Sequence, residues 1–315
     1  MARRSERGAE GATPLRLRAH LACPPAGGLR ALRLTLHLDG VSYRVDPTCA
    51  HDLSIPLRFH GPQPNFFGVP RAASVPYRQG SVVGDTRQGG SCNFEVHTII
   101  PHCQGTHTEG VGHVTRERIP ILDLLDETLL PATLVSVRPE DALASPEAYL
   151  PRKAPGDTMI TAARLRDALE GRNRAFLRGV VLRTLPNDPE KAARNYDEAP
   201  LPPYLSLDAV DFLSDLGVRH LLVDLPSIDR MHDEGRLCAH HRFWEVPPGV
   251  SAPEAISPRT ITEMIFVPDD VADGLYLLNL QVAGFEADAA PSRPILYEVY
   301  PDVSRRPCLC RSEGP

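Results

Sequence analysis

Residues 101–114 read PHCQGTHTEGVGHV and hold three histidines and one carboxylate among small residues that cannot fill a hydrophobic core: His102, His107, Glu109 and His113. The glycines between them permit backbone conformations that other residues resist. The preceding residues 94–100 read FEVHTII, which is typical of a strand. A strand that delivers such a loop can aim imidazole and carboxylate groups at one point. The stretch therefore predicts a divalent-metal site.

Further ligands are available downstream. The segment from Asp224 to Asp229 ends a predicted strand, and the carboxyl ends of strands in α/β sheets are where sites are built. Turn capping alone can also account for both side chains. A metal such as zinc takes about four N, O or S ligands. The set that satisfies one metal, or two with a bridging carboxylate, consists of His102, His107, Glu109, His240 and Glu263.

The composition excludes several classes of protein. With 42% hydrophobic and 23% charged residues, the 315-residue chain resembles an ordinary globular protein. A net charge of −6 without a long basic run argues against nucleic acid as the main partner. We find no apolar run long enough for a membrane span and no signal-peptide core. Seven cysteines without regular spacing favour reduced thiols in a cytoplasmic protein.

Hydrophobic periodicity predicts a single α/β domain over residues 29–305, flanked by poorly ordered tails at 1–28 and 306–315. A β-hairpin is predicted at 32–45, where two alternating runs flank Asp39-Gly40. Thr161 and Ser206 are predicted helix N-caps. Further strands are predicted at 134–137, 176–184, 218–225, 261–267, 275–282 and 295–300. This succession indicates a mixed sheet with flanking helices.

Phe66 and Phe67 are two adjacent aromatic residues in a stretch rich in Pro, Gly, Asn and Gln, residues 51–90. They can line an apolar pocket for a small-molecule substrate, or they can cap one edge of the core. Both interpretations remain open at this point.

Several segments together resemble the metal-dependent cyclase family, which includes bacterial kynurenine formamidases. GTHTEGVGH resembles the family signature H-x-G-T-H-x-D-x-P-x-H. Residues 51–57 (HDLSIPL) resemble its opening D-I-S-x-P-L, and residues 217–229 (GVRHLLVDLPSID) resemble its G-V-x5-D-x-P-S-x-D segment. Ala239-His240, Thr262-Glu263 and residues 284–294 follow in the family order.

The resemblance implies a swivelling β/β/α fold, a homodimer or higher homo-oligomer, and one or two catalytic zinc ions, with manganese as the alternative. It implies that His102, His107, Glu109, His240 and Glu263 bind the metal and that His113 transfers the proton. The signature has one residue between its first His and Gly, whereas Cys103 and Gln104 both lie between His102 and Gly105 here. His102 and Cys103 are therefore alternative first ligands.

The function that the resemblance implies is hydrolysis of a small amide by metal-activated water, as in arylformamidases that act on N-formylkynurenine in tryptophan catabolism. The altered loop leaves two alternatives open. A relative can use the same metal site for cyclisation or dehydration in secondary metabolism, or it can be a non-catalytic metal- or ligand-binding protein.

Overall fold

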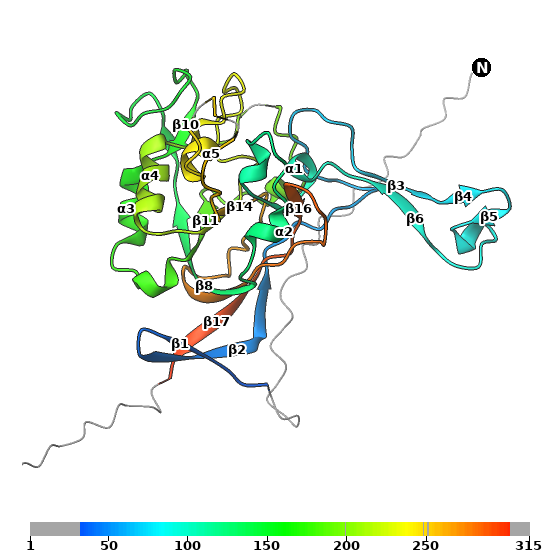
Figure 1. Ribbon diagram of the computed structural model, residues 1–315, viewed down its shortest axis with the longest axis horizontal. Helices are drawn as coiled ribbons and strands as arrows, with labels where there is room; N and C mark the ends of the chain where they lie inside the picture. The colour runs from blue at the N-terminus through cyan, green and yellow to red at the C-terminus, as the bar shows by residue number, and fades with distance from the viewer. Residues whose placement is uncertain (1–31, 199, 248, 251, 303–315) are drawn as a thin grey trace, which may run out of the picture.

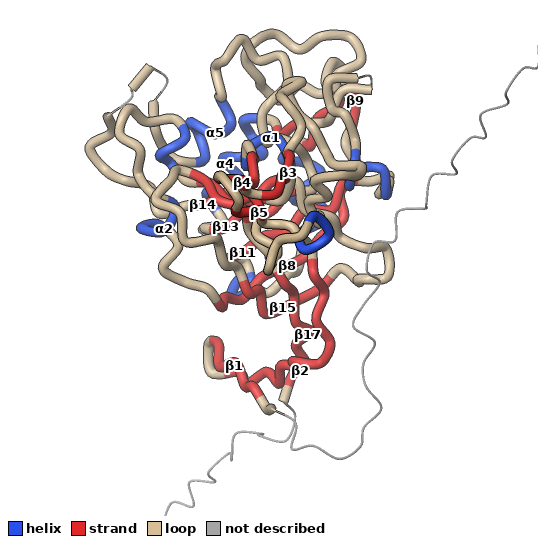
Figure 2. The backbone as a smooth tube through the Cα atoms, turned by 90° about the vertical axis from the view of Figure 1, so that its right-hand side faces the viewer, coloured by secondary structure: helices blue, strands red, loops and turns tan. Residues whose placement is uncertain are grey.

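The computed structural model describes residues 32–302 except 199, 248 and 251, and within them a ten-stranded mixed sheet forms the framework (Figure 1). The strand order is β1-β2-β17-β15-β8-β11-β13-β14-β7-β16. The bounds are β1 (Leu34–Leu38), β2 (Val41–Asp52), β7 (His107–Glu109), β8 (Leu129–Val137), β11 (Gly179–Thr184), β13 (His220–Val223), β14 (Thr260–Glu263), β15 (Gly274–Asn279), β16 (Ala289–Pro291) and β17 (Ile295–Pro301). Figure 2 shows the sheet running from β1 and β2 at one end to β13 and β14 near the other.

The centre of the sheet consists of four parallel strands, β8, β11, β13 and β14. All residues of the last three are buried. Strands that are covered on both faces have continuous apolar runs in their sequences, and these runs allowed the central strands to be predicted. Val180 and Leu182 of β11 join the core under the helices, whereas Val181 between them packs in the core on the opposite face.

Helices α3 (Ala162–Leu169), α4 (Leu207–Asp215) and α5 (Cys238–Phe243) contribute to the first of these cores, and so do Ile121 and Leu124 of a shorter helix. The predicted caps are confirmed, because the Thr161 hydroxyl accepts from Arg164 N and the Ser206 hydroxyl accepts from Ala209 N. The single α/β domain with a mixed sheet and flanking helices is likewise confirmed. The short helices are α1 (Pro101–Gln104) and α2 (Ile121–Leu124), with 3-10 turns at Thr86–Gln88, Val111–His113, Arg174–Phe176 and Pro189–Ala193.

The predicted N-terminal hairpin is confirmed by β1 and β2, which pair with Leu38 opposite Val41. Asp39 and Gly40 have φ angles of 47° and 77°, as a two-residue turn with the twist of a hairpin requires. Strand β2 continues to Asp52 and pairs with β17. The hairpin is therefore the edge of the main sheet.

A separate two-stranded ribbon, which we call the arm (residues 73–98), projects from the body in Figure 1. It pairs β3 (Ala73–Pro76) with β6 (Glu95–Thr98) and carries β4 (Arg78–Gln79) and β5 (Val82–Val83). The strand predicted at 94–100 is thus present, but it lies outside the main sheet and all four residues of β6 are exposed. A third small sheet joins β9 (Glu140–Asp141), β10 (Thr158–Ile160) and β12 (Tyr204–Leu205).

The cysteines differ in part from the sequence prediction. Cys92, Cys103 and Cys238 are free thiols, but Cys49 is disulfide-bonded. The prediction of reduced thiols is therefore wrong for Cys49, because a disulfide depends on distance in space, which spacing along the chain does not give. The cytoplasmic location that rested on reduced thiols stays a prediction.

The tails predicted at 1–28 and 306–315 lie outside the described residues, and the domain bounds 29 and 305 stay predictions. Within the part of the chain that the structure describes, no helix has the length and apolarity needed to cross a membrane.

Candidate metal centre

Strand β7 positions the first two side chains of the site. Residues two apart on a strand share a face, so His107 and Glu109 point the same way. Thr108 between them pairs instead with Thr262, the two hydroxyl oxygens being 2.8 Å apart. Glu263 of β14 lies directly opposite His107 in the antiparallel pairing. The prediction of a loop at these positions is therefore wrong, because residues 107–109 form a buried strand. The pairing of this strand with β14 brings three predicted ligands together.

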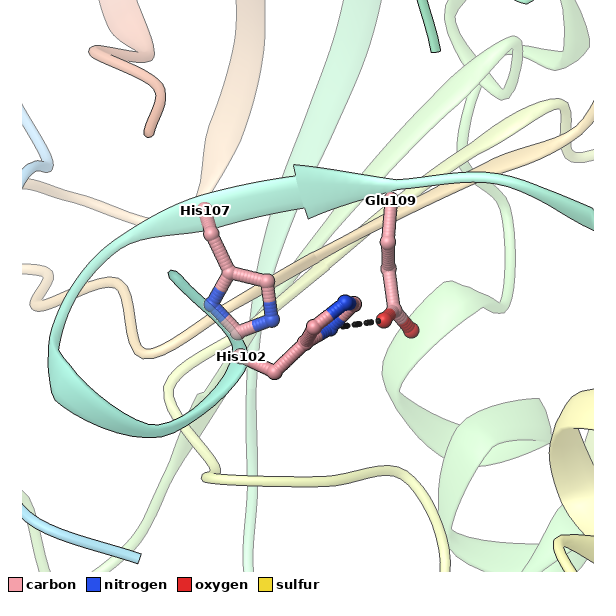
Figure 3. A group of neighbouring side chains, drawn as sticks. All are labelled: His102, His107 and Glu109. Atoms are coloured by element: carbon pink, nitrogen blue, oxygen red, sulfur yellow. Dashed lines mark ion pairs between the residues drawn. The ribbon is translucent and has the colours of Figure 1, made fainter. Parts of the chain in front are cut away.

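Short helices bring two more histidines to the same face. His240 of α5 places Nε2 2.8 Å from Glu109 Oε1 and 3.5 Å from Glu263 Oε1. His102 of α1 places Nδ1 2.9 Å from Glu109 Oε2, the contact drawn in Figure 3. His107 Nε2 lies 3.6 Å from Glu263 Oε2. All five side chains that the sequence predicted as ligands thus meet.

The ligand atoms form two groups that share Glu109. One contains His102, His107 and Glu109, the other Glu109, His240 and Glu263, and within each group the atoms lie within 4.8 Å of one another. A carboxylate common to two groups is the arrangement that bridges two ions, and it also allows one ion to take ligands from both.

The second nitrogen of each of these histidines is held by an oxygen outside the groups. His107 Nδ1 bonds Gly105 O at 2.9 Å, His240 Nδ1 bonds Asp229 Oδ2 at 2.6 Å, and His102 Nε2 bonds Asp288 Oδ2 at 3.1 Å. Metal-binding histidines are typically oriented in this way. The inward Nε2 of His107 is buried and has no hydrogen-bond partner among the described residues. The donor set therefore fits a divalent cation.

Burial and neighbouring charges shift the pKa values of the proposed ligands in ways that favour a bound cation. Burial lowers the pKa of His107 to about 4, which leaves its imidazole neutral with a lone pair available. Burial raises the pKa of Glu263, and the charge of Glu109 adds to the effect. For Glu109 itself burial opposes ionisation, but His113 and His240 outweigh it and hold the pKa well below its usual range. A bound cation would relieve the repulsion between the two carboxylates.

Cys103 lies elsewhere. It packs in an apolar cluster with Phe66 and Met231, and it belongs to none of the groups of metal-ligand type found among the described residues. Burial raises the pKa of its thiol to about 11, so the thiol keeps its proton at neutral pH. Of the two alternatives for the first ligand, the geometry favours His102.

His113 lies at the rim of the site, in the 3-10 turn after β7. Its Nδ1 is 3.5 Å from Asp288 Oδ2 and 3.9 Å from Glu109 Oε2, and its side chain is 25% exposed. The ring centroid is 4.3 Å from that of His102. His113 is thus adjacent to the proposed ligands and partly exposed to solvent.

A cavity of about 70 Å³ lies beside the cluster, and Phe66, Phe67, His102, Glu109, His113 and His240 are among its lining residues. Phe66 is buried, whereas Phe67 is 60% exposed, and their ring centroids are 4.0 Å apart. The volume is well below the ~300–1,000 Å³ of typical small-molecule sites. A larger hollow of about 990 Å³ near residues 59–73 contains none of the ligand groups, so chemistry and not size locates the site.

Sequence reasoning missed the role of two carboxylates that orient histidines of the site. Asp229 stood in the D-x-P-S-x-D segment as a candidate ligand, with turn capping as the alternative. Asp288 stood in the closing segment, residues 284–294, where the family pattern has one Asp and this chain reads FEAD at 285–288, and no role was assigned to it. Both act on histidines far away in the chain, which only the folded sheet brings near.

The fold and the site define a class of protein: an α/β sheet that carries a buried histidine–carboxylate cluster suited to a divalent cation. The family model described as putative cyclase matches residues 51–230, more than half of the chain. The chain belongs to this family.

A kynurenine formamidase from Bacillus thuringiensis is 27% identical over 211 residues, which cover 66% of this chain and 82% of that protein. Isatin hydrolase A from Labrenzia aggregata superposes with a TM-score of 0.54 at 13% identity, over 79% of this chain and 93% of its own. A potential metal-dependent hydrolase with cyclase activity has a TM-score of 0.50 at 19% identity, over 79% and 98%. At these identities the structural likenesses support the fold.

Proposed function

We propose that this member of the putative cyclase family is a metal-dependent hydrolase that cleaves the C–N bond of a small amide. The observation that carries the proposal is the orientation of the histidines. Three imidazoles are each fixed by an outer oxygen, while their other nitrogens face the buried carboxylate of Glu109, that of Glu263, or both. A site built in this way serves a cation and its reaction, because the isolated buried charges cost stability.

The proposed cofactor is a divalent metal, zinc first and manganese second, as one or two ions. His102, His107, Glu109, His240 and Glu263 would hold it, and their nitrogen and oxygen donors suit zinc. The metal supplies Lewis acidity, which polarises a carbonyl and acidifies water.

His113 is the proposed proton-transfer residue. It takes a proton from the water whose oxygen attacks the amide carbon, and it returns a proton to the nitrogen of the leaving amine as the C–N bond breaks. The products are a carboxylic acid and an amine. The half-buried position of His113 at the rim suits both transfers, since it touches the ligand cluster and the solvent.

The proposed substrate is an aryl formamide such as N-formylkynurenine, which would place the enzyme in tryptophan catabolism. Two features support this proposal: the name of the Bacillus relatives and the aromatic pair at the cavity. Phe66 and Phe67 offer apolar surface to an aryl ring. Because the cavity is small, we infer that the exposed Phe67 moves when the substrate enters.

We also propose that the protein forms a homodimer through the arm. Val75, Phe94 and Val96 of the arm are 56%, 43% and 47% exposed. A two-stranded ribbon is at best marginally stable by itself in water, so a second copy that covers this apolar surface would stabilise it.

The test is metal analysis of the purified protein followed by assays on N-formylkynurenine, an aryl formamide, a lactam and a lactone. We expect stoichiometric metal and turnover of a formamide. Loss of a residue that merely orients a ligand weakens metal binding or activity ~10–100-fold, so His107→Ala, which removes a ligand, should lose at least ~100-fold.

His60→Ala is the matched control, because His60 is an exposed histidine outside the site. Protein without stoichiometric metal, or His107→Ala with wild-type turnover, would contradict the proposal. Turnover of only the lactam or the lactone would contradict the proposed substrate class, but it would still support a hydrolytic metal site.

A further inference from the structure

We propose that Asp288 is a positioning residue that orients both His102 and His113 through one carboxylate oxygen. The inference rests on the proposed function, because it assigns a role within the same site. It assigns a role to a residue outside the proposed ligands and the proposed proton-transfer residue.

The fold places Asp288 at the rim with little freedom. It directly precedes β16, which pairs with β7 so that Ala289 lies opposite Glu109. Its carbonyl accepts from Gly110 N at 3.1 Å. A Cβ on Gly112 would come within 3.2 Å of Asp288 Cβ, so a glycine there lets the two segments approach closely.

A single oxygen of Asp288 faces both histidines. Oδ2 lies 3.1 Å from His102 Nε2 and 3.5 Å from His113 Nδ1. The contact to His102 leaves Nδ1 of that ring as the nitrogen aimed at Glu109. The contact to His113 engages Nδ1, which leaves Nε2 as the nitrogen for exchanging protons with water and the leaving amine.

The other carboxylate near His113 is Glu109, whose Oε2 is 3.9 Å from Nδ1. Glu109 belongs to both groups that would hold the metal, so a bound cation competes for it. Asp288 is then the carboxylate that still orients His113. It also couples the two rings, since a shift of Asp288 would turn a ligand and the proton-transfer residue together.

The same three side chains, His102, His113 and Asp288, form a third group with ligand atoms within 4.8 Å. A metal ion at the rim is the competing interpretation of these contacts. It differs from positioning in a measurable way, because removal of Asp288 would then reduce the metal content.

The experiment compares Asp288→Ala and Asp288→Asn with the control Glu286→Ala, whose side chain is exposed nearby. Two substrates share the formyl group: an aryl formamide, whose leaving amine needs a proton, and an aryl formate ester, whose phenolate does not. For Asp288→Ala we expect kcat on the formamide to fall ~10–100-fold, with an unchanged number of bound ions per chain when the protein is saturated with zinc. KM should stay within about twofold, and the loss on the ester should be smaller. Asp288→Asn keeps an acceptor oxygen and should recover part of the rate.

A second readout does not depend on turnover. In zinc-loaded protein, ¹⁵N NMR of the histidine rings should show His113 protonated at Nδ1 in the wild type and a changed tautomer balance in Asp288→Ala. Equal losses on both substrates, loss of one bound ion per chain in protein saturated with zinc, or an unchanged His113 signal would overturn the proposal. A wild type inactive on both substrates would contradict the proposed function alone, since the NMR comparison would still decide the role of Asp288.

Discussion

Asp229 supports a helix and a proposed ligand with one buried carboxylate. Oδ1 accepts from Ala239 N at 2.7 Å and from the Tyr149 hydroxyl at 2.6 Å. Oδ2 accepts from His240 N at 3.0 Å and lies 2.6 Å from His240 Nδ1. Burial opposes its ionisation, but the bond and charge of His240 outweigh burial and lower its pKa. The carboxylate therefore satisfies the start of α5 and aims Nε2 of His240 at the cluster.

At this scale we predict that Asp229→Asn weakens metal binding ~10–100-fold, as measured by competition with a chelator. The amide nitrogen cannot accept from the donors that now converge on the carboxylate. Tyr149→Phe is the control, because it removes one donor and keeps the carboxylate, so its effect should be smaller. Equal affinities of Asp229→Asn and wild type would show that His240 needs no such support.

The loop around Phe67 lines the cavity beside the metal cluster. Phe67 and Gly68 have φ angles of 61° and 56°, a left-handed conformation that is unfavourable for phenylalanine. Such a residue costs ~1–3 kcal/mol and is often found where function needs it. In this conformation the exposed ring of Phe67 lines the cavity.

We expect Phe67→Ala to raise KM for an aryl formamide about three- to tenfold, because an aromatic contact contributes ~0.5–1.5 kcal/mol. Metal content and kcat should be unchanged, since Phe67 belongs to none of the ligand groups. Phe94→Ala, an aromatic residue of the arm, is the control. A fall in kcat without a change in KM would place Phe67 in the chemistry instead.

The pairing of β13 with β14 buries a histidine that lies outside the metal cluster. His220 is fully buried, and its Nδ1 lies 2.8 Å from the Thr260 hydroxyl. Burial, aided by the charge of Arg219, lowers the pKa of His220 to about 4. The unfolded chain has the ordinary value of about 6.5 and so binds the proton first as the pH falls.

The free energy of unfolding should therefore fall as the pH drops from about 6.5 to about 4, and His220 should account for ~3 kcal/mol of that loss. Above pH 6.5 this contribution is fully present. Urea unfolding at pH 7.5 and at pH 4.5 checks it. His220→Asn is the comparison, because carboxylates also titrate in this range; parallel pH curves for the two proteins would refute the assignment.

At the scale of the whole molecule, the arm and the hairpin occupy separate parts of the body in Figure 1. The arm directly precedes the metal cluster in the chain, since β6 ends at Thr98 and α1, which carries His102, begins at Pro101. An interface on the arm would therefore lie close in sequence to the site.

We predict that light scattering will give a mass near twice the 34.5 kDa of the chain. Val96→Glu should shift the protein to a monomer, because it buries a charge in the proposed contact. Val41→Glu, an equally exposed valine of the hairpin, should not. A monomeric wild type, or a dimer that tolerates Val96→Glu, would contradict an interface at the arm.

Local features of the fold follow from the sequence alone, because they depend on neighbours a few residues apart. Asp39-Gly40 defines the hairpin turn, and Thr161 and Ser206 define the starts of α3 and α4. The hydrophobic runs mark the central strands for the same reason. Ligand chemistry in the sequence suggested that His240 and Glu263 complete the set around residues 102–109, and the family resemblance supported the same five residues.

The tertiary structure decided what the metal cluster is made of and what supports it. The partners are distant in the chain: His240 and Glu109 are 131 residues apart, and Asp288 and His102 are 186. Their distances depend on the register of β7 between β14 and β16, which no local pattern specifies. Because residues 107–109 pair with both neighbouring strands, they form a strand and not the predicted loop. The sequence thus determined which groups are available, and the pairing of strands determined which of them meet.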